Sequence, residues 1–424
     1  MPTSTRRLFA LSVNAVLAGG LTAQREQPQQ LTFPGLLHKA EREAGNPLAT
    51  YAAMLALDAQ YRASPVFATI YPEVRGNYEQ FLGVLGAGEA AMALPALRAE
   101  YPDDDAPIPD GFVPKDAVAT IVAAAANTRL VIFGEEHHLP QTRSLYEALL
   151  RGLWQQGYRW LAAETFTPAV MAADFRVPDY GSGYYVMDPV YASAVRTAVA
   201  LGYRLVAYDT AERGPPGDGS FRDRTQAETL KRAVFDRDED AKLVVFAGRG
   251  HAADVPPADG WTPMASVLKR LTGIDPLTVF APTMSQRATP AEEHPLYRFA
   301  TAHGLVPAPV VFVGANGAML GSGNCDAWVF WPRVVSIDGR PDWLVRELGR
   351  QPFAIPDSLR AGEGLRLVQA WLPDEPERAV PLDQVLLAPG AAPPALMLPA
   401  AGSFRLRAID AAGHVQGPIT IERR

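Results

Sequence analysis

Two carboxylates and two imidazoles stand side by side in GEEHH, residues 134–138, directly after the apolar run RLVIF. An imidazole can take a proton from water near neutral pH, and a neighbouring carboxylate can hold it in one tautomer. The same nitrogen and oxygen atoms also suit several divalent metal ions. The chain has only 7 histidines. Two of them in this segment make it a candidate for hydrolytic or metal chemistry.

Acidic residues and a histidine also follow three further apolar runs. Glu164 ends RWLAAE, Asp209 ends YRLVAYD, and His251 follows AKLVVFAG within GRGH. The carboxyl ends of neighbouring parallel strands meet at one edge of a sheet, where ligands bind. We therefore expect these three residues and Glu135 to surround one pocket.

Neighbouring side chains point in different directions, so only one of His137 and His138 is expected to enter this pocket. The candidate catalytic residues are Glu135, His137, His138, Glu164 and His251. The candidate substrate-binding residues are Asp209, Tyr184, Tyr185, Arg222, Arg224 and Arg249. Three histidines outside the predicted strand ends, His294, His303 and His414, are expected to have no part in the chemistry.

Alternating strands and helices would position these residues. Short apolar runs, rich in β-branched and aromatic residues, are typical of strands buried on both faces. They cover residues 129–134, 159–164, 203–209, 241–248, 277–281 and 309–313. Amphipathic stretches that predict helices cover residues 141–157, 188–202 and 223–238. This alternation predicts an α/β domain with a mostly parallel sheet, over residues 116–335.

The flanking regions have different patterns. Residues 24–115 predict a helical region that ends in an acidic, proline-rich linker near residues 101–114. Residues 336–424 are strand-rich with glycine turns, which is typical of a β-sandwich-like accessory module. Residues 1–23 combine two arginines, an apolar stretch and a small final residue. This pattern predicts a Sec or twin-arginine export signal, and a periplasmic or secreted protein without a stable membrane anchor after cleavage.

The overall composition limits the partners and the redox chemistry. A net charge of −7 and a pI near 5.6 argue against nucleic acid as a partner, because such binding requires a basic surface. A small-molecule or peptide substrate is expected instead. The single cysteine, Cys325, cannot form an intrachain disulfide and is interpreted as a buried thiol.

The order of these motifs resembles the superfamily that includes erythromycin esterases, Tiki-type membrane metalloproteases and haem-binding iron-regulated lipoproteins. Gly134, Glu135 and His137 match its G-E-x-H motif, Glu164 matches its second glutamate, and Gly248 with His251 matches its G-x-x-H motif. The resemblance covers roughly residues 125–285.

Two positions of the resemblance have alternatives. Erythromycin esterases generally show G-E-x-x-H, which selects His138 in place of His137. Either Arg222 or Arg224 resembles the arginine that opens a helix before the last motif in such proteins.

The resemblance implies an exported hydrolase in which a glutamate and histidine cluster activates water to cleave an ester, lactone or amide. Glu135, His137, Glu164 and His251 would also be the ligands of a zinc, manganese, iron or cobalt ion, if a metal is used. The alternative is a periplasmic protein that binds haem or iron through a histidine of this site. The sequence does not identify the substrate.

Overall fold

The structure is a computed structural model of the 424-residue chain. It describes residues 47–49, 51–52, 55, 71–87, 90–91, 94, 101–210, 212, 214–258 and 260–424. The predicted export signal and the first part of the predicted helical region lie outside the described residues.

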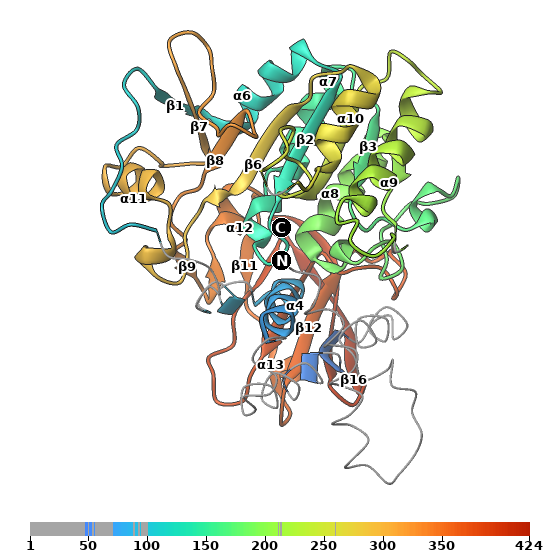
Figure 1. Ribbon diagram of the computed structural model, residues 1–424. Helices are drawn as coiled ribbons and strands as arrows, with labels where there is room; N and C mark the ends of the chain where they lie inside the picture. The colour runs from blue at the N-terminus through green and yellow to red at the C-terminus, as the bar shows by residue number, and fades with distance from the viewer. Residues whose placement is uncertain are drawn as a thin grey trace, which may run out of the picture.

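An eight-stranded sheet in the order β1-β7-β8-β6-β2-β5-β3-β4 forms the centre of the larger part of the fold (Figure 1). Six neighbouring strands of this sheet run parallel. They are β2 (Leu130–Glu135), β3 (Trp160–Ala163), β4 (Arg204–Ala207), β5 (Leu243–Gly248), β6 (Leu277–Met284) and β8 (Ala327–Phe330). Their shared direction brings their carboxyl ends to one edge.

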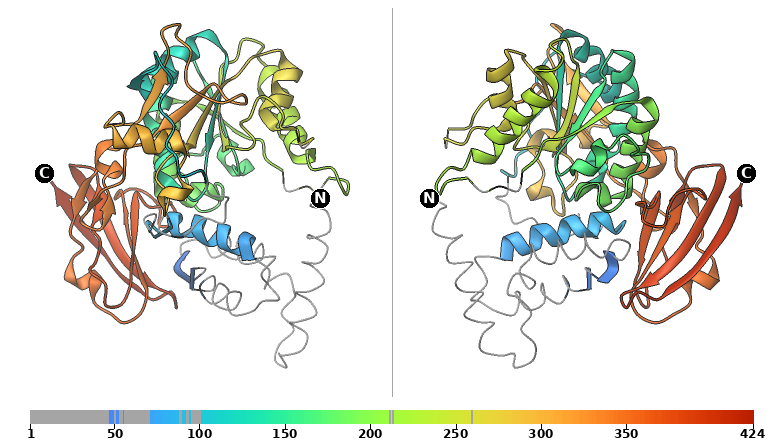
Figure 2. Two further views of the ribbon diagram at one scale, coloured as in Figure 1. Left: turned by 60° about the vertical axis from the view of Figure 1, so that its left-hand side comes forward. Right: turned by 90° about the vertical axis from the view of Figure 1, so that its right-hand side faces the viewer.

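Helices cover both faces of the sheet, as the two views of Figure 2 show. One face carries α6 (Ala117–Ala124), α7 (Tyr146–Gln155) and α8 (Pro189–Leu201). The other carries α10 (Met264–Thr272) and α9 (Phe221–Leu230), which a π-helical turn continues over Lys231–Phe235. Alternate residues of β2 enter the two cores, with Phe133 on the first face and Ile132 on the second. Burial on both faces explains the continuous apolar runs of the parallel strands.

The remaining edge of the sheet is antiparallel. β7 (Val310–Val313) is antiparallel to both of its neighbours, β1 (Val113–Asp116) and β8. The helix α11 (Pro295–Ala302) packs there through Tyr297, beside Phe312 and Phe330.

The predicted α/β fold with a mostly parallel sheet is confirmed. All six predicted runs contain strands, although the last of them, β7, is antiparallel. Strands β8 and β1 were not expected. β1 lies across the predicted end of the helical region at residue 115, and all four of its residues are exposed, so it has no apolar pattern.

The C-terminal part is a second, antiparallel sheet in the order β13-β12-β15-β16. Its strands are β12 (Arg366–Trp371), β13 (Asp383–Leu387), β15 (Gly402–Asp410) and β16 (Val415–Arg423). Shorter elements accompany it: β9 (Ser336–Ile337), β10 (Arg340–Pro341), α12 (Trp343–Arg346), β11 (Gln351–Phe353), α13 (Asp357–Arg360) and β14 (Leu396–Leu398). The predicted strand-rich tail is therefore present.

In both views of Figure 2, the helix α4 (Tyr71–Val84) lies below the large sheet and beside the C-terminal strands. Phe81 belongs to an apolar cluster with Met187, which precedes α8, and with Leu367 of β12. The carbonyl of Val84 accepts a hydrogen bond from the Gln384 side chain at 2.6 Å. α4 therefore contacts both parts of the fold near the carboxyl edge of the large sheet.

The predicted acidic linker is held against α11. Arg298 donates hydrogen bonds to the carbonyl oxygens of Pro102, Asp103 and Asp104, and it pairs with Asp105 at 2.6 Å. These contacts fix the chain just after Tyr101.

In the part of the chain that the structure describes, no helix is both long and apolar enough to cross a membrane.

Candidate functional site

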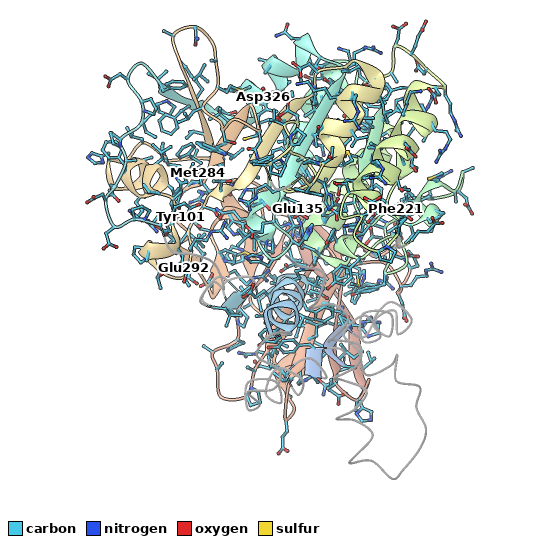
Figure 3. The ribbon with its side chains drawn as sticks, in the orientation of Figure 1. Tyr101, Glu135, Phe221, Met284, Glu292 and Asp326 are labelled. Atoms are coloured by element: carbon cyan, nitrogen blue, oxygen red, sulfur yellow. The ribbon has the colours of Figure 1, made fainter. Side chains whose placement is uncertain are left out.

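The predicted site residues gather at the carboxyl edge of the parallel strands. Glu135 is the last residue of β2, Glu164 directly follows β3, and Asp209 lies two residues after β4. Figure 3 shows Glu135 near the lower ends of the central strands, between Tyr101 on one side and Phe221, the first residue of α9, on the other. The edge carries two histidine–carboxylate pairs.

The first pair is His137 with Glu135. His137 Nδ1 lies 2.6 Å from Glu135 Oε1. Arg143 donates from Nε to Glu135 Oε2 at 2.7 Å and from Nη1 to Asp188 Oδ2 at 2.7 Å. Asp188 in turn accepts the N–H of Val190 and so begins α8. His137 is therefore joined through Glu135 and Arg143 to the start of a core helix.

The carboxylate and the arginine that hold His137 are buried. The side chains of Glu135 and Arg143 are each 2% exposed. Burial opposes the charge of Glu135, but the charges of Arg143 and His137 outweigh it and lower the pKa of Glu135. Burial raises the pKa of Asp188. Arg143 thus keeps Glu135 ionised as a hydrogen-bond acceptor for the His137 ring.

A strained turn sets the ring plane of His137. The ring stacks on Tyr185 with centroids 4.0 Å apart. Tyr185 is held by a hydrogen bond from its N–H to Thr165 Oγ1 at 3.1 Å. Thr165 has φ of +66°, a conformation that costs a β-branched residue roughly 1–3 kcal/mol. Such strain is typical of functional sites, and here it falls on the residue directly after Glu164.

Gly248 brings the first pair close to Glu164. A Cβ placed on Gly248 would lie 2.9 Å from His137 Nε2 and 3.2 Å from Glu164 Oε2. Only glycine leaves room for both groups. The N–H of Gly248 also donates to Glu164 Oε2 at 2.6 Å. The His137 ring and the Glu164 carboxylate therefore share the space beside the end of β5.

The second pair is His251 with Asp223. His251 Nδ1 lies 2.6 Å from Asp223 Oδ1, which also accepts the N–H of Met264 at 2.8 Å. Asp223 Oδ2 accepts from Trp261 Nε1 at 3.0 Å. Asp223 is buried and lies in the first turn of α9. Both of its oxygens are occupied, so the carboxylate is fixed in orientation.

Arg222 joins the second pair to Glu164. Its Nη1 lies 3.1 Å from His251 Nε2, and its Nη2 donates to Glu164 Oε1 at 2.8 Å. Asp209 holds the other side of the guanidinium, at 2.9 Å from Nε and 2.6 Å from Nη2. His251 Nε2 is itself 3.6 Å from Glu164 Oε1. Glu164 therefore lies between the two histidines.

The charges at the centre favour an ionised Glu164 and a protonated His251. Burial opposes the charge of Glu164, but both imidazoles and Arg222 lower its pKa from 4.5 to about 2. Burial also acts against the charged form of His251, but Asp223 and Glu164 raise its pKa above 6.5. A permanent negative charge thus faces both rings.

The two imidazoles share one arrangement. Each Nδ1 lies against a carboxylate oxygen, and we assign it as the protonated nitrogen because an ionised carboxylate can only accept. Both rings lie beside Glu164, and the Nε2 of His251 also lies 3.1 Å from Arg222 Nη1, whose hydrogen bond it can accept only while it carries no proton. The side chains of His137 and His251 are 23% and 17% exposed, so solvent reaches both rings.

The donor set does not fit a divalent cation at this position. Both Nδ1 atoms are occupied by carboxylates, and the Arg222 guanidinium lies between His251 Nε2 and Glu164. A fixed positive charge there repels a metal ion. Among the described residues, no group of three or more histidines, cysteines and acids is arranged to hold a metal.

Several predicted residues lie away from the centre. His138 Nδ1 is 3.9 Å from Glu136 Oε1, and Arg224 pairs with Asp218 at a partly exposed position. The geometry therefore brings His137 and Arg222 to the centre in preference to His138 and Arg224. Tyr184 contacts the Tyr185 ring edge at 5.4 Å between centroids.

The remaining histidines outside the predicted strand ends have structural contacts. His294 begins α11 by accepting the N–H of Leu296, and His303 stacks on Phe299. His414 lies exposed beside Asp410 in a hairpin. Cys325 is a buried free thiol, as expected.

Sequence reasoning missed the residues that hold the histidines: Arg143, Asp188, Asp223 and Trp261. Arg143 and Asp223 lie in helical segments that were predicted from apolar spacing alone. The available signal was their place within one turn of a helix start that follows a strand carrying a site residue. Buried charges at such positions give no periodic pattern.

Comparisons with known proteins give little similarity. No protein-family model matches the chain, and no curated protein sequence is significantly similar to it. The type III effector HopBA1 is similar at 14% identity, over 53% of this chain and 99% of that one, with a TM-score of 0.31. A structure described as bacterial protein toxins is similar at 12% identity, over 42% and 38%, with a TM-score of 0.29. Neither likeness carries an argument about function.

Proposed function

We propose that this protein is a hydrolase that activates water with two histidine–carboxylate pairs around Glu164. The substrate bond is an ester, lactone or amide. The observation that carries the proposal is the matching geometry of the pairs, in which each Nδ1 lies 2.6 Å from a carboxylate and both rings lie beside the same glutamate, Glu164. Such an arrangement prepares two imidazoles for proton transfer.

His137 suits the general base. With its Nδ1 proton held by Glu135, the Nε2 lone pair can take a proton from water as the water oxygen attacks the acyl carbon. The imidazolium that forms lies beside the ionised Glu164 and over the Tyr185 ring, and both stabilise its positive charge.

His251 suits the general acid. Its raised pKa favours the protonated ring, which can donate a proton to the leaving oxygen or nitrogen as the acyl bond breaks. Asp223 is a positioning residue that fixes this ring at Nδ1, and when Nε2 is protonated it no longer accepts a hydrogen bond from Arg222 Nη1, 3.1 Å away. The two histidines thus move one proton each, in opposite directions.

The metal-dependent variant and the haem-binding alternative remain separate proposals. A haem ligand needs a histidine nitrogen over a broad apolar face, whereas Glu164 and Arg222 surround the nitrogens here. Soret absorbance in freshly purified protein tests the haem alternative, and loss of activity with a chelator tests the metal-dependent one. The basic and apolar pattern of residues 1–23 supports export.

A panel of esters, lactones and peptides, followed with the full chain, tests the proposed hydrolase. Replacing His137 or His251 with alanine should lower kcat/KM by about 10²–10⁴-fold, the usual contribution of a general acid or base. The double variant should fall little below the worse single variant, because the two residues act on the same reaction.

His138→Ala and His414→Ala are the matched controls, because each also removes one histidine. Both should leave kcat/KM within about twofold, since His138 lies beside Glu136 and His414 beside Asp410, outside the two histidine–carboxylate pairs. Retained turnover in folded His137→Ala and His251→Ala proteins, checked by circular dichroism, contradicts the proposed chemistry.

A further inference from the structure

Two arginines lie at the end of β2, apart from Arg222. Arg249 directly follows Gly248, and its N–H donates to the Glu135 carbonyl at 2.8 Å. Arg287 follows β6, the other neighbour of β2, and donates to Glu136 Oε2 at 3.0 Å. The carboxyl end of β2 is therefore flanked by two guanidinium groups.

Only one of these two cations has a carboxylate partner. Arg287 is paired with Glu136 and also donates to the Pro282 carbonyl at 2.7 Å. Within the described part of the chain, the Arg249 guanidinium has no hydrogen bond or ion pair. Arg249, Arg287 and Glu136 together carry one excess positive charge.

The two guanidinium groups are close enough to affect each other. Burial lowers the pKa of Arg249, and the charge of Arg287 lowers it further. Burial also lowers the pKa of Arg287. Glu292 and Glu293 also act on Arg287, so the uncompensated charge is that of Arg249, and a bound anion would relieve the cost of burying it.

A polar side chain borders this arginine pair. Tyr101 lies near both arginines, is 38% exposed, and packs edge-on against His294 with ring centroids 5.1 Å apart. Its hydroxyl can donate a hydrogen bond to an anion from the solvent side.

The opposite side of the centre has the reverse charge balance. There, Arg222 and the protonated His251 face three carboxylates, those of Glu164, Asp209 and Asp223. The carboxylates beside α9 outnumber the cations there, whereas the Arg249 guanidinium at the end of β2 has no carboxylate partner among the described residues. An anionic ligand would therefore be attracted to Arg249 rather than to the α9 side.

We propose that Arg249 and Arg287 bind a carboxylate or phosphate group of the substrate, and so orient the scissile bond toward His137. A guanidinium fork matches such oxyanions with two parallel hydrogen bonds. Arg249 directly follows Gly248, which lies beside the His137 ring, so the backbone of Arg249 adjoins the reacting centre. This inference rests on the proposed hydrolase for its substrate, but the binding of an anion can be measured without turnover.

Calorimetric titration of the full chain with inorganic phosphate and with succinate tests the site. The wild-type protein should bind at least one probe, and Arg249→Gln should weaken that binding by about tenfold or more. Arg237→Gln, at an exposed arginine after α9, should bind as wild type. Absent binding of both probes, or equal binding by the two variants, overturns the proposal.

A matched pair of ester substrates, with and without a free carboxylate near the ester, separates this inference from the proposed function. Arg249→Gln should lower the ratio of kcat/KM for the acidic ester to kcat/KM for the neutral ester by about tenfold. Phosphate binding that depends on Arg249, together with no turnover of any ester, supports the anion site and contradicts the hydrolase. Turnover of both esters without preference contradicts the anion site alone.

Discussion

The two histidine–carboxylate pairs have the same geometry but different surroundings. Glu135 and His137 depend on Arg143, whose side chain is 2% exposed and joins β2 to α8. Asp223 and His251 are held by Arg222, whose side chain is 39% exposed. One arginine therefore belongs to the core and the other to the accessible surface of the site.

This difference separates stability from chemistry. A buried arginine that serves two buried carboxylates is part of what allows that core to form, because its removal leaves uncompensated charges. A half-exposed arginine can be replaced by water with little cost to folding, but its effect on a neighbouring imidazole remains. A histidine–carboxylate pair held by a buried arginine thus contributes to the stability of the fold, whereas one held by a more exposed arginine can have its pKa changed with little effect on stability.

The largest expected effect comes from the buried arginine. Arg143→Met should lower the free energy of unfolding by about 3–5 kcal/mol, because Glu135 and Asp188 lose their shared partner while buried. Arg222→Met should lower it by less, about 1–2 kcal/mol, because water reaches that guanidinium but the buried Glu164 loses a partner. Urea unfolding followed by circular dichroism measures both values.

A suitable control is Arg196→Met, which breaks a side-chain pair with Glu375 far from the histidines. It should fall between the two variants. Equal destabilisation by Arg143→Met and Arg222→Met would contradict the proposed difference between the two histidine–carboxylate pairs.

A smaller effect is expected at Gly248, where the two halves meet. Gly248→Ala adds one methyl group 2.9 Å from His137 Nε2, so either the ring or the Glu164 carboxylate must shift. We expect kcat/KM to fall by about tenfold or more, because small displacements of a catalytic group are costly. Stability should change by roughly 1–3 kcal/mol, as in other overpacked sites.

Gly323→Ala is the matched control, since a Cβ at Gly323 would meet no atom within 4 Å. It should retain wild-type kcat/KM. Full activity in Gly248→Ala would mean that the contact of His137 with the end of β5 is not needed for the reaction.

The fold was largely predictable because burial on both faces leaves a strong sequence signal. The run at residues 241–248 contains β5, and the run at residues 129–134 overlaps nearly all of β2. Strand direction has no such signal, so β7 was recognised as a strand without its antiparallel direction. β1 was missed because Val113–Asp116 is exposed throughout and held only by backbone pairing with β7.

The site was predictable only at its strand ends. Glu135, Glu164 and His251 were found because strand ends of a parallel sheet converge. Arg143 and Asp223 could not be found in this way, because their importance depends on which buried carboxylate or imidazole the helix start meets in space. The choice between His137 and His138 likewise depends on the backbone direction after β2, which the spacing does not determine.

The smallest expected effect concerns the titration of His251. Its pKa is raised above 6.5 because Asp223 and Glu164 outweigh burial and Arg222. A raised pKa means that His251 contributes stability fully below its unfolded pKa, and that this contribution is lost as the pH rises through the folded pKa. If His251 is the general acid, activity should also fall over that alkaline range.

Asp223→Asn tests the cause of this shift. It removes the negative charge while burial remains, so the pKa of His251 should fall by about one unit or more, and the alkaline limb of the activity profile should move to lower pH by the same amount. An asparagine also has one acceptor oxygen, whereas Asp223 accepts from His251, Trp261 and the Met264 N–H with both oxygens, so a modest loss of stability should accompany the shift. The titration of His251 by NMR, together with the pH dependence of kcat/KM, measures the shift in pKa and the shift of the alkaline limb.

Asp209→Asn is the control. It neutralises a carboxylate that contacts Arg222 but not the imidazole, and it should move the pKa of His251 much less. An alkaline limb that stays in place in Asp223→Asn, while the NMR pKa falls, would assign the proton donor to a group other than His251.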